Sequence, residues 1–305
     1  MQDSVRLPAF AKINLCLHIL GRRPDGYHEL RTVFQTISLH DTLEIERTGQ
    51  HGILLETTDP ALPSGPENLV WRAIDAMRRE LDISGGIHAK LNKRIPVARG
   101  LGGGSSDAAA AIAGMLLLSG ERLPLARAIE IASSLGADVP FFLFGGRALG
   151  INRGDEIYPL PDRQKQSVVV VSPHDIGVST RQAYGWASSE LTKDADPSKL
   201  WGFCALCWSR QGSGVSNDFE APVFRRHPRL ATIRRRLLQR GAAEAALAGS
   251  GSAVFGLFRS PAQARRAAHA FSKDPVFVVE TLSREEYARS LRVRLNEEGE
   301  IVGRR

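Results

Sequence analysis

The residues Gly100–Asp107 have the composition of a phosphate-binding loop. Four of the five positions from Gly100 to Gly104 are glycine, which lets the backbone adopt positive φ angles and approach a ligand closely. Two serines and an aspartate follow, residue types favoured at helix starts, and an alanine- and leucine-rich helix is predicted from Ala108. Free N–H groups and the positive end of the helix dipole would then point at one spot, where a phosphate group fits. The alternative is a flexible surface loop.

Two common phosphate loops are excluded by residue type. A Walker A loop requires Gly-Lys followed by Ser or Thr, and residues 100–107 contain no lysine. A dinucleotide-binding fingerprint counted from Gly100 requires a third glycine where Ser105 stands.

Lys12 and Asn14 are a second pair of residues that could do chemistry. Residues 9–20 alternate between two faces, as in a β-strand, and Lys12 and Asn14 fall on the same face. On a strand they would lie about 7 Å apart. This face lines a site or meets solvent, and the pattern alone leaves both open.

Asp138 stands between a glycine-alanine pair and Val139-Pro140. At this position a carboxylate could cap a short helix that begins there. It could equally serve as a catalytic carboxylate, and one residue can do both.

The surrounding pattern predicts the elements that would position these residues. Antiparallel strands are predicted first, over 9–20 and 31–47, the second broken near His40 and Asp41. The next predicted elements are helices over 69–81 and 123–135 around a strand at 87–95. After a change of composition near 159–163, we expect a buried strand at 167–172, a helix reaching Tyr184, one arginine-rich amphipathic helix closed by Gly241, and a second glycine-serine loop at 248–253 that feeds a strand.

Composition bounds the class of protein. The chain has 305 residues, 43% apolar and 24% charged, which is typical of a soluble protein with two domains, and no apolar run is long enough to span a membrane. The cysteines, Cys16, Cys204 and Cys207, are too few for a disulfide framework, and a cytoplasmic location is expected. The net charge of +7 is consistent with binding of nucleic acid or with long-range attraction of anionic metabolites.

Five motifs together resemble the GHMP small-molecule kinases. They are Ala11-Lys-Ile-Asn-Leu15, Pro24-Asp-Gly-Tyr-His28, Gly100-Leu-Gly-Gly-Gly-Ser-Ser-Asp107, Gly136-Ala-Asp-Val-Pro-Phe141 and Gly249-Ser-Gly-Ser-Ala253. The glycine-rich motifs are shared across the family. The other three are similar to those of the members that phosphorylate 4-diphosphocytidyl-2-C-methyl-D-erythritol in the non-mevalonate isoprenoid pathway.

The resemblance implies an α+β fold of two domains, a ribosomal protein S5 domain 2-like domain followed by a ferredoxin-like domain. We place the ATP-binding domain at 1–160 and the second domain at 161–305. The implied activity is ATP-dependent phosphorylation of the substrate's 2-hydroxyl, a tertiary alcohol, with magnesium as the accompanying ion and its ligands unknown. The implied partner is a small molecule rather than nucleic acid or membrane, and the implied state is a monomer or homodimer.

The resemblance also implies roles for individual residues. Asp138 matches the family's catalytic carboxylate, which accepts the hydroxyl proton, and Lys12 matches the lysine that pairs with it. Positions that match the ATP site are Asn68 and Lys93 near the adenine and, around the phosphates, Gly100, Leu101, Gly102, Gly103, Gly104, Ser105 and Ser106. Positions that match the cytidyl substrate's pocket are Asn14, Tyr27, His28, Asp138 and Tyr184, the last as a stacking partner for cytosine.

Arg99 departs from the family pattern, since related loops carry a small residue there. Its side chain either adds a phosphate contact or faces solvent.

Two other functions remain open: a GHMP kinase acting on homoserine, mevalonate or a sugar, and a non-enzymatic RNA-binding protein. Lys12 with Tyr27 and His28 argues against the first, and the phosphate loop with Asp138 argues against the second.

Overall fold

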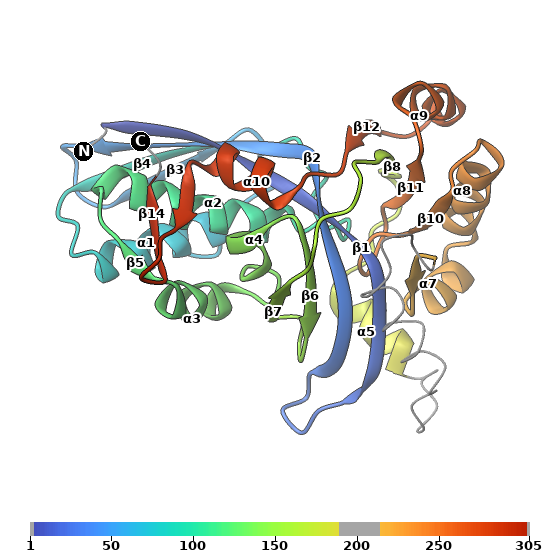
Figure 1. The fold of residues 1–305 in the computed structure, drawn as a ribbon, viewed down its shortest axis with the longest axis horizontal. Coiled ribbons are helices and arrows are strands. Elements are labelled where there is room, and N and C mark those ends of the chain that lie inside the picture. The colour runs from blue at the N-terminus through green and yellow to red at the C-terminus, as the bar shows by residue number, and fades with distance from the viewer. Residues whose placement is uncertain (1–2, 189–213, 304–305) are drawn as a thin grey trace.

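The computed structural model of the chain describes residues 3–188 and 214–303 (Figure 1). Residues 192–213, which include Cys204 and Cys207 and to which the sequence assigns no role, lie outside them. Through residue 160 the elements are β1 (Ser4–Arg22), β2 (His28–Thr48), β3 (Ile53–Thr57), α1 (Leu69–Glu80), β4 (Gly86–Asn92), α2 (Gly103–Ser119), β5 (Leu123–Pro124), α3 (Leu125–Leu135), α4 (Phe141–Phe144), β6 (Arg147–Ile151) and β7 (Glu156–Pro159). They are followed by β8 (Ser167–Val171), α5 (Thr180–Ser188), β9 (Ser216–Asn217), α7 (Glu220–Arg226), α8 (Pro228–Gln239), β10 (Glu244–Leu247), β11 (Val254–Phe258), α9 (Pro261–Ala268), β12 (Val276–Glu280), α10 (Arg284–Leu291), β13 (Val293–Leu295) and β14 (Glu300–Gly303).

The long strands β1 and β2 form an antiparallel hairpin that runs through the whole molecule (Figure 1). The predicted break near His40 and Asp41 is wrong, because β2 continues through both residues. The irregularity lies in the register instead: Phe10 pairs with His40, whereas Lys12 pairs with Thr36, so β2 carries extra residues opposite Ala11. A bulge of this kind increases the local twist and re-aims the side chains beside it, here that of Lys12.

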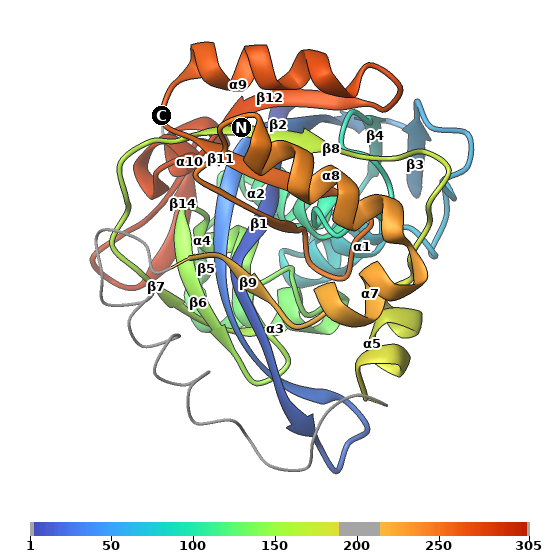
Figure 2. The same ribbon diagram turned by 90° about the vertical axis from the view of Figure 1, so that its right-hand side faces the viewer.

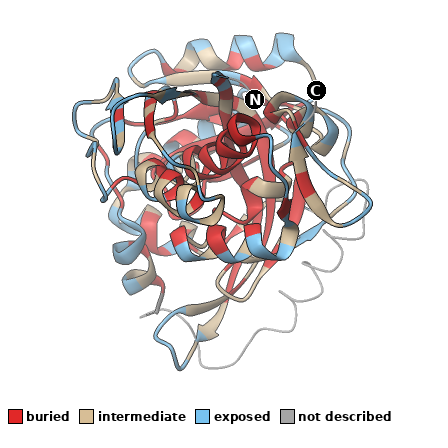
Figure 3. Ribbon diagram, turned by 90° about the vertical axis from the view of Figure 1, so that its left-hand side faces the viewer, coloured by how far each residue is buried: buried red, intermediate tan, exposed pale blue. Residues whose placement is uncertain are grey.

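The first sheet has the path β3-β4-β2-β1-β9, and off this path β6 pairs with β2 and β7 pairs with β6. Helix α2 packs on it and is buried from Ser106 to Ser119. Its run of alanines lets the helix approach the strands closely, and Gly114 fits where a Cβ would lie 2.7 Å from Ile45. Figure 3 shows the buried residues gathered at this centre and the exposed residues at the rim.

The second sheet is antiparallel, in the order β10-β11-β8-β12. Strand β8 is buried on both faces, since Val168 and Val170 belong to a buried cluster with residues of β1 and β2, while Val169 and Val171 belong to another with residues of α8 and α9. Figure 2 shows those two helices on the outer side of this sheet. The predicted α+β class is confirmed. No helix among the described residues is long and apolar enough to cross a membrane.

The arginine-rich segment forms two helices rather than the one predicted. Helix α7 ends at Arg226, and Pro228 opens α8 as its first residue. A proline lacks the N–H that a continuous helix requires, so the chain turns at His227.

The C-terminal residues 284–303 return to the first core. Strand β14 pairs with β5, and Figure 1 shows both chain ends on the same side of the molecule. Tyr287 is buried there against Phe10, with ring centroids 5.7 Å apart, and its hydroxyl donates a hydrogen bond to the carbonyl of Phe142 at 2.5 Å. The predicted domain boundary at residue 160 stays a prediction. Residues after it, in α10 and β14, pack with elements that come before it.

Replacing Tyr287 by Phe should lower the free energy of unfolding by about 1–3 kcal/mol, because the buried Phe142 carbonyl loses its partner while the ring contact is kept. Urea titration measures the change. Tyr158→Phe is the control, since that ring is 48% exposed, and it should have little effect. Equal effects of the two substitutions would contradict this role of Tyr287.

Candidate active site

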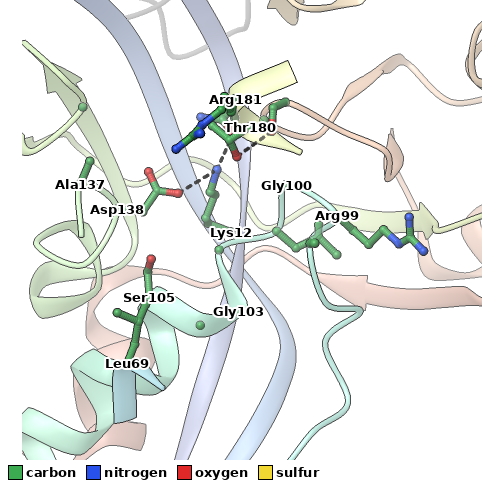
Figure 4. A pocket seen from close by; sticks show the side chains of 18 of the residues that line it. Lys12, Leu69, Arg99, Gly100, Gly103, Ser105, Ala137, Asp138, Thr180 and Arg181 are labelled. Atoms are coloured by element: carbon green, nitrogen blue, oxygen red, sulfur yellow. Dashed lines mark hydrogen bonds and ion pairs between the residues drawn. The ribbon is translucent and has the colours of Figure 1, made fainter. Parts of the chain in front are cut away.

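A cleft of about 1110 Å³ opens between the glycine loop, the β1–β2 hairpin and helix α5 (Figure 4). The predicted site residues that line it are Lys12, Asn14, Tyr27, His28, Asn68, Lys93, Gly100, Leu101, Gly102, Gly103, Gly104, Ser105, Asp138 and Tyr184. Ser106 is the exception: it is 1% exposed, does not line the cleft, and its buried hydroxyl has no hydrogen-bond partner in the described part of the chain. The structure thus brings together nearly every residue that the sequence singled out.

The glycine loop leads into a helix, as predicted. Gly102 precedes the helix with a φ of 71°, and the N–H of Ser106 donates to its carbonyl at 2.9 Å, closing the first turn. The residues between them, Gly103 to Ser105, therefore present N–H groups that have no acceptor within the helix. Since these residues line the cleft, the start of α2 offers it hydrogen-bond donors and a positive dipole end.

The loop is held against the second glycine-serine loop. A Cβ at Gly100, whose φ is 77°, would lie 1.9 Å from the carbonyl oxygen of Ala248. Asn217 fixes the second loop by donating from Nδ2 to the carbonyls of Leu247 at 2.9 Å and Gly249 at 2.7 Å. Gly249 also lines the cleft, so both glycine loops contribute to one site.

Arg99 lines the cleft, but its guanidinium is engaged within the fold. Its guanidinium donates to the carbonyls of His174, at 3.1 Å, and Ile176, and to the hydroxyl of Ser252 at 3.0 Å. Figure 4 shows the side chain directed away from Lys12 and Asp138. Arg99 therefore joins the glycine loop to the second half of the chain.

Lys12 and Asp138 form an ion pair at the centre of the cleft, with Nζ 3.4 Å from Oδ2 (Figure 4). The lysine side chain is 5% exposed, whereas that of Asp138 is 34% exposed. The Asp138 carboxylate can therefore contact a ligand on its exposed side while the buried Lys12 ammonium balances its charge.

The capping interpretation of Asp138 is wrong. Helix α4 begins after Pro140, and no side chain accepts a hydrogen bond at its start. Asp138 lies two residues earlier, in the turn after α3, and is directed at Lys12.

A chain of hydrogen bonds orients the Lys12 ammonium. Nζ donates to Asn14 Oδ1 at 2.9 Å, Asn14 Nδ2 donates to Thr32 Oγ1 at 2.7 Å, and Thr32 donates to the carbonyl of Cys16 at 2.7 Å. The ammonium also lies 5.5 Å from the ring centroid of Phe34, a cation–π contact. Lys12 and Asn14 thus line the site together, and their strand face does not meet solvent.

The far end of the cleft is aromatic. The rings of His28 and Tyr184 stack with centroids 4.6 Å apart and an angle of 18° between their planes. Burial, together with the charge of Arg22, lowers the pKa of His28, which favours a neutral imidazole. Burial and the charge of Asp138 raise the pKa of Tyr184, so its hydroxyl is neutral. Tyr27, 56% exposed, stands at the rim beneath Arg153.

Comparison with known proteins identifies the family. The chain matches the GHMP kinases N terminal domain over residues 68–146 and the GHMP kinases C terminal over residues 200–276. It is 47% identical, over 92% of this chain and 90% of the relative, to the 4-diphosphocytidyl-2-C-methyl-D-erythritol kinase of Solibacter usitatus. The enzyme of that name from Moorella thermoacetica is 42% identical over 87% of this chain and 94% of its own. The chain belongs to the 4-diphosphocytidyl-2-C-methyl-D-erythritol kinase family.

Solved structures agree. A crystal structure of 4-(cytidine 5'-diphospho)-2C-methyl-D-erythritol kinase superposes with a TM-score of 0.76 at 35% identity, covering 91% of this chain and 99% of that one. A homoserine kinase from Cytophaga hutchinsonii, 19% identical over 93% of this chain and 96% of its own with a TM-score of 0.69, shares the fold. The predicted two-domain GHMP kinase fold is confirmed, and ATP is the co-substrate of this kinase.

Asn68 and Lys93, predicted near the adenine, both carry structural bonds in this kinase. Asn68 caps α1 by accepting from the N–H of Val70 at 2.9 Å and donates to the carbonyl of Pro63 at 2.8 Å. Lys93 is bound between two carboxylates, Asp41 and Asp107, the latter at 2.7 Å. Their contact with adenine stays a prediction.

The cluster of Asp41, Lys93 and Asp107 is a part of the kinase site that sequence reasoning missed. Asp41 also accepts from the N–H of Ile95 at 2.7 Å, so the cluster joins β2, the segment before the glycine loop, and α2. Burial raises the pKa of Asp107 to about 8, although the charge of Lys93 opposes this. A signal was present, because Asp41 falls on the inward face of β2 in line with Leu39 and Leu43, where an unpaired carboxylate is costly.

Replacing Lys93 by Ala should destabilise this kinase by about 3–5 kcal/mol, because two buried carboxylates lose the ammonium with which they pair. Lys90→Ala is the matched control, because Lys90 lies on β4, whose last residue directly precedes Lys93. Its side chain is 51% exposed and lies 4.0 Å from Glu46, so the cost should stay below about 1 kcal/mol. Urea unfolding measures both, and a Lys93 variant as stable as the Lys90 variant would show that the cluster does not hold the loop.

Proposed function

We propose that the protein transfers the γ-phosphoryl group of ATP to the 2-hydroxyl of 4-diphosphocytidyl-2-C-methyl-D-erythritol. The observation that carries the proposal is the Lys12–Asp138 pair, which lies between the phosphate-binding start of α2 and the stacked rings of His28 and Tyr184. The relatives that cover most of the chain bear the name of this activity.

Each part of the cleft has a role in this reaction. Asp138 accepts the proton of the attacking hydroxyl, and Lys12 stabilises the negative charge around it. The N–H groups of Gly103 to Ser105 hold the phosphate oxygens of ATP. Phosphoryl transfer depends mainly on positioning and charge stabilisation, and a network fixed through Asn14 supplies both.

The residues of the cleft also fit magnesium. Such an ion prefers oxygen ligands and takes most of them from phosphates and water, so one or two protein oxygens suffice. The Ser105 hydroxyl and the Asp138 carboxylate line the cleft and are of this kind. When bound with ATP, the ion would neutralise phosphate charge.

We further propose a cytoplasmic monomer or homodimer whose ligands are these small molecules rather than nucleic acid. The arginines of α7 and α8 are consistent with this, because several are engaged within the fold. Arg229, for example, pairs with Asp175 and Asp274 at 2.6 Å. A cationic surface also attracts anionic substrates by long-range steering.

Asp138→Asn should reduce the turnover rate on the order of 10²–10⁴-fold while ATP still binds, since the amide keeps the shape but cannot accept the proton. Lys12→Ala should be nearly as damaging, and the double variant little worse, because residues acting as one unit are not additive. Steady-state kinetics with a coupled ADP assay measures this. Asp75→Asn, which alters a surface pair with Arg79 on α1, is the control and should retain wild-type turnover. A folded Asp138→Asn protein with wild-type turnover would exclude the role of base.

A substrate panel tests the choice of acceptor. Stacking on an aromatic ring is worth about 1–3 kcal/mol per base, so removing the cytidyl group should cost a large part of the binding energy. Methylerythritol 4-phosphate, homoserine and mevalonate should therefore be very poor acceptors in the presence of ATP and magnesium. Equal rates with any of them would refute the proposed substrate.

A further inference from the structure

Helix α5 presents one face to the cleft. Thr180, Arg181 and Tyr184 line the cleft, whereas Ala183 and Ala187 on the other side are buried in the core. Thr180 also meets the second glycine loop, with its hydroxyl 3.3 Å from that of Ser250. The cleft-facing side of α5 is thus fixed in place. It carries Arg181, a cation without a role in the proposed reaction as described above.

Arg181 lines the cleft without a carboxylate partner among residues 3–188 and 214–303, as does Arg22 near His28, whereas two other cations of the cleft are paired. Lys12 pairs with Asp138, and Arg153 pairs with Asp155. Arg181 also stands in the first turn of α5, where the helix dipole disfavours a cation and where no acidic residue compensates it. The guanidinium and the helix end together make a positive potential that an anion would relieve.

The place of Arg181 indicates which anion. Figure 4 shows its guanidinium extending to the side of the cleft where Asp138 and Lys12 lie. Tyr184 follows three residues later, one turn along the same face, and stacks on His28. In the proposed substrate a diphosphate joins the cytidine to the methylerythritol, so it must lie between the base-stacking rings and the residues that meet the hydroxyl.

Resting on the proposed function, we infer that Arg181 binds the diphosphate of the cytidyl substrate and thereby selects for a nucleoside diphosphate conjugate. A guanidinium suits this task, because its planar array of donors matches two phosphate oxygens at once. Arg181 is a binding and specificity residue here, and the γ-phosphate of ATP is left to the start of α2.

Kinetics of Arg181→Gln provide the first test. A charge-assisted bond lost from the substrate alone should raise KM for the cytidyl substrate about 10- to 100-fold, with KM for ATP unchanged and kcat altered only a few-fold. Arg181→Lys should lie between wild type and Arg181→Gln. The control is Arg235→Gln on α8, an exposed arginine that does not line the cleft and should leave all three constants unchanged.

Calorimetry provides a test that does not depend on turnover. With the ATP site saturated by a non-hydrolysable ATP analogue, the wild-type protein should bind cytidine diphosphate about 10- to 100-fold more tightly than cytidine, and Arg181→Gln should lose this preference. An unchanged preference, or a rise in KM for ATP instead, would overturn the role of Arg181 while leaving the proposed function intact. If wild type neither binds cytidine diphosphate nor phosphorylates the cytidyl substrate, the proposed function fails and this inference with it.

Discussion

The site depends on the nearly buried ammonium of Lys12. A charge removed from water is costly unless it is paired and hydrogen-bonded, and Lys12 obtains its partners from separate elements. Asn14 lies on its own strand, Asp138 in the turn after α3, and Phe34 on β2. The backbone N–H of Lys12 also donates to the carbonyl of Leu101 in the glycine loop at 2.9 Å. Satisfying one charge therefore sets the distances between Asp138, Asn14 and the glycine loop.

The same constraint explains the irregular register of the hairpin. A regular ladder continued from the Phe10–His40 pair would place Lys12 opposite Ser38, whereas the bulge opposite Ala11 moves the pairing of Lys12 to Thr36. Strand bulges commonly re-aim a side chain next to an active site, and the twist that they add is retained for that reason. Here the bulge lies directly before the residue whose direction matters most.

Features set by residues close together in the sequence could be predicted, whereas contacts between residues far apart in the sequence could not. The period-two pattern places Lys12 and Asn14 on one face, and four glycines beside a helix start predict the phosphate loop, because both signals are local. The orientation of α2 was not predictable, since the helix is apolar on every side beyond its first turn and no amphipathic pattern assigns Ser105 to the cleft and Ser106 to the interior. The hydrogen bonds of Arg99 could not be predicted for another reason. Their acceptors on Ile176 and Ser252 are far away in the sequence and come close to Arg99 only in the folded chain.

The division of labour between the two halves of the chain gives the cleft its chemistry. The charges that surround the reaction, Lys12, Asp138 and the cluster around Lys93, are fixed within the first half, where the buried helix α2 makes movement costly. The stacking ring of Tyr184 comes instead from α5, which packs on the second sheet's core. A change on α5 can therefore alter this end of the cleft without disturbing the glycine loop before α2. Kinases named for homoserine and mevalonate share the fold with this chain at 19% and 16% identity, and one fold can carry sites of different specificity.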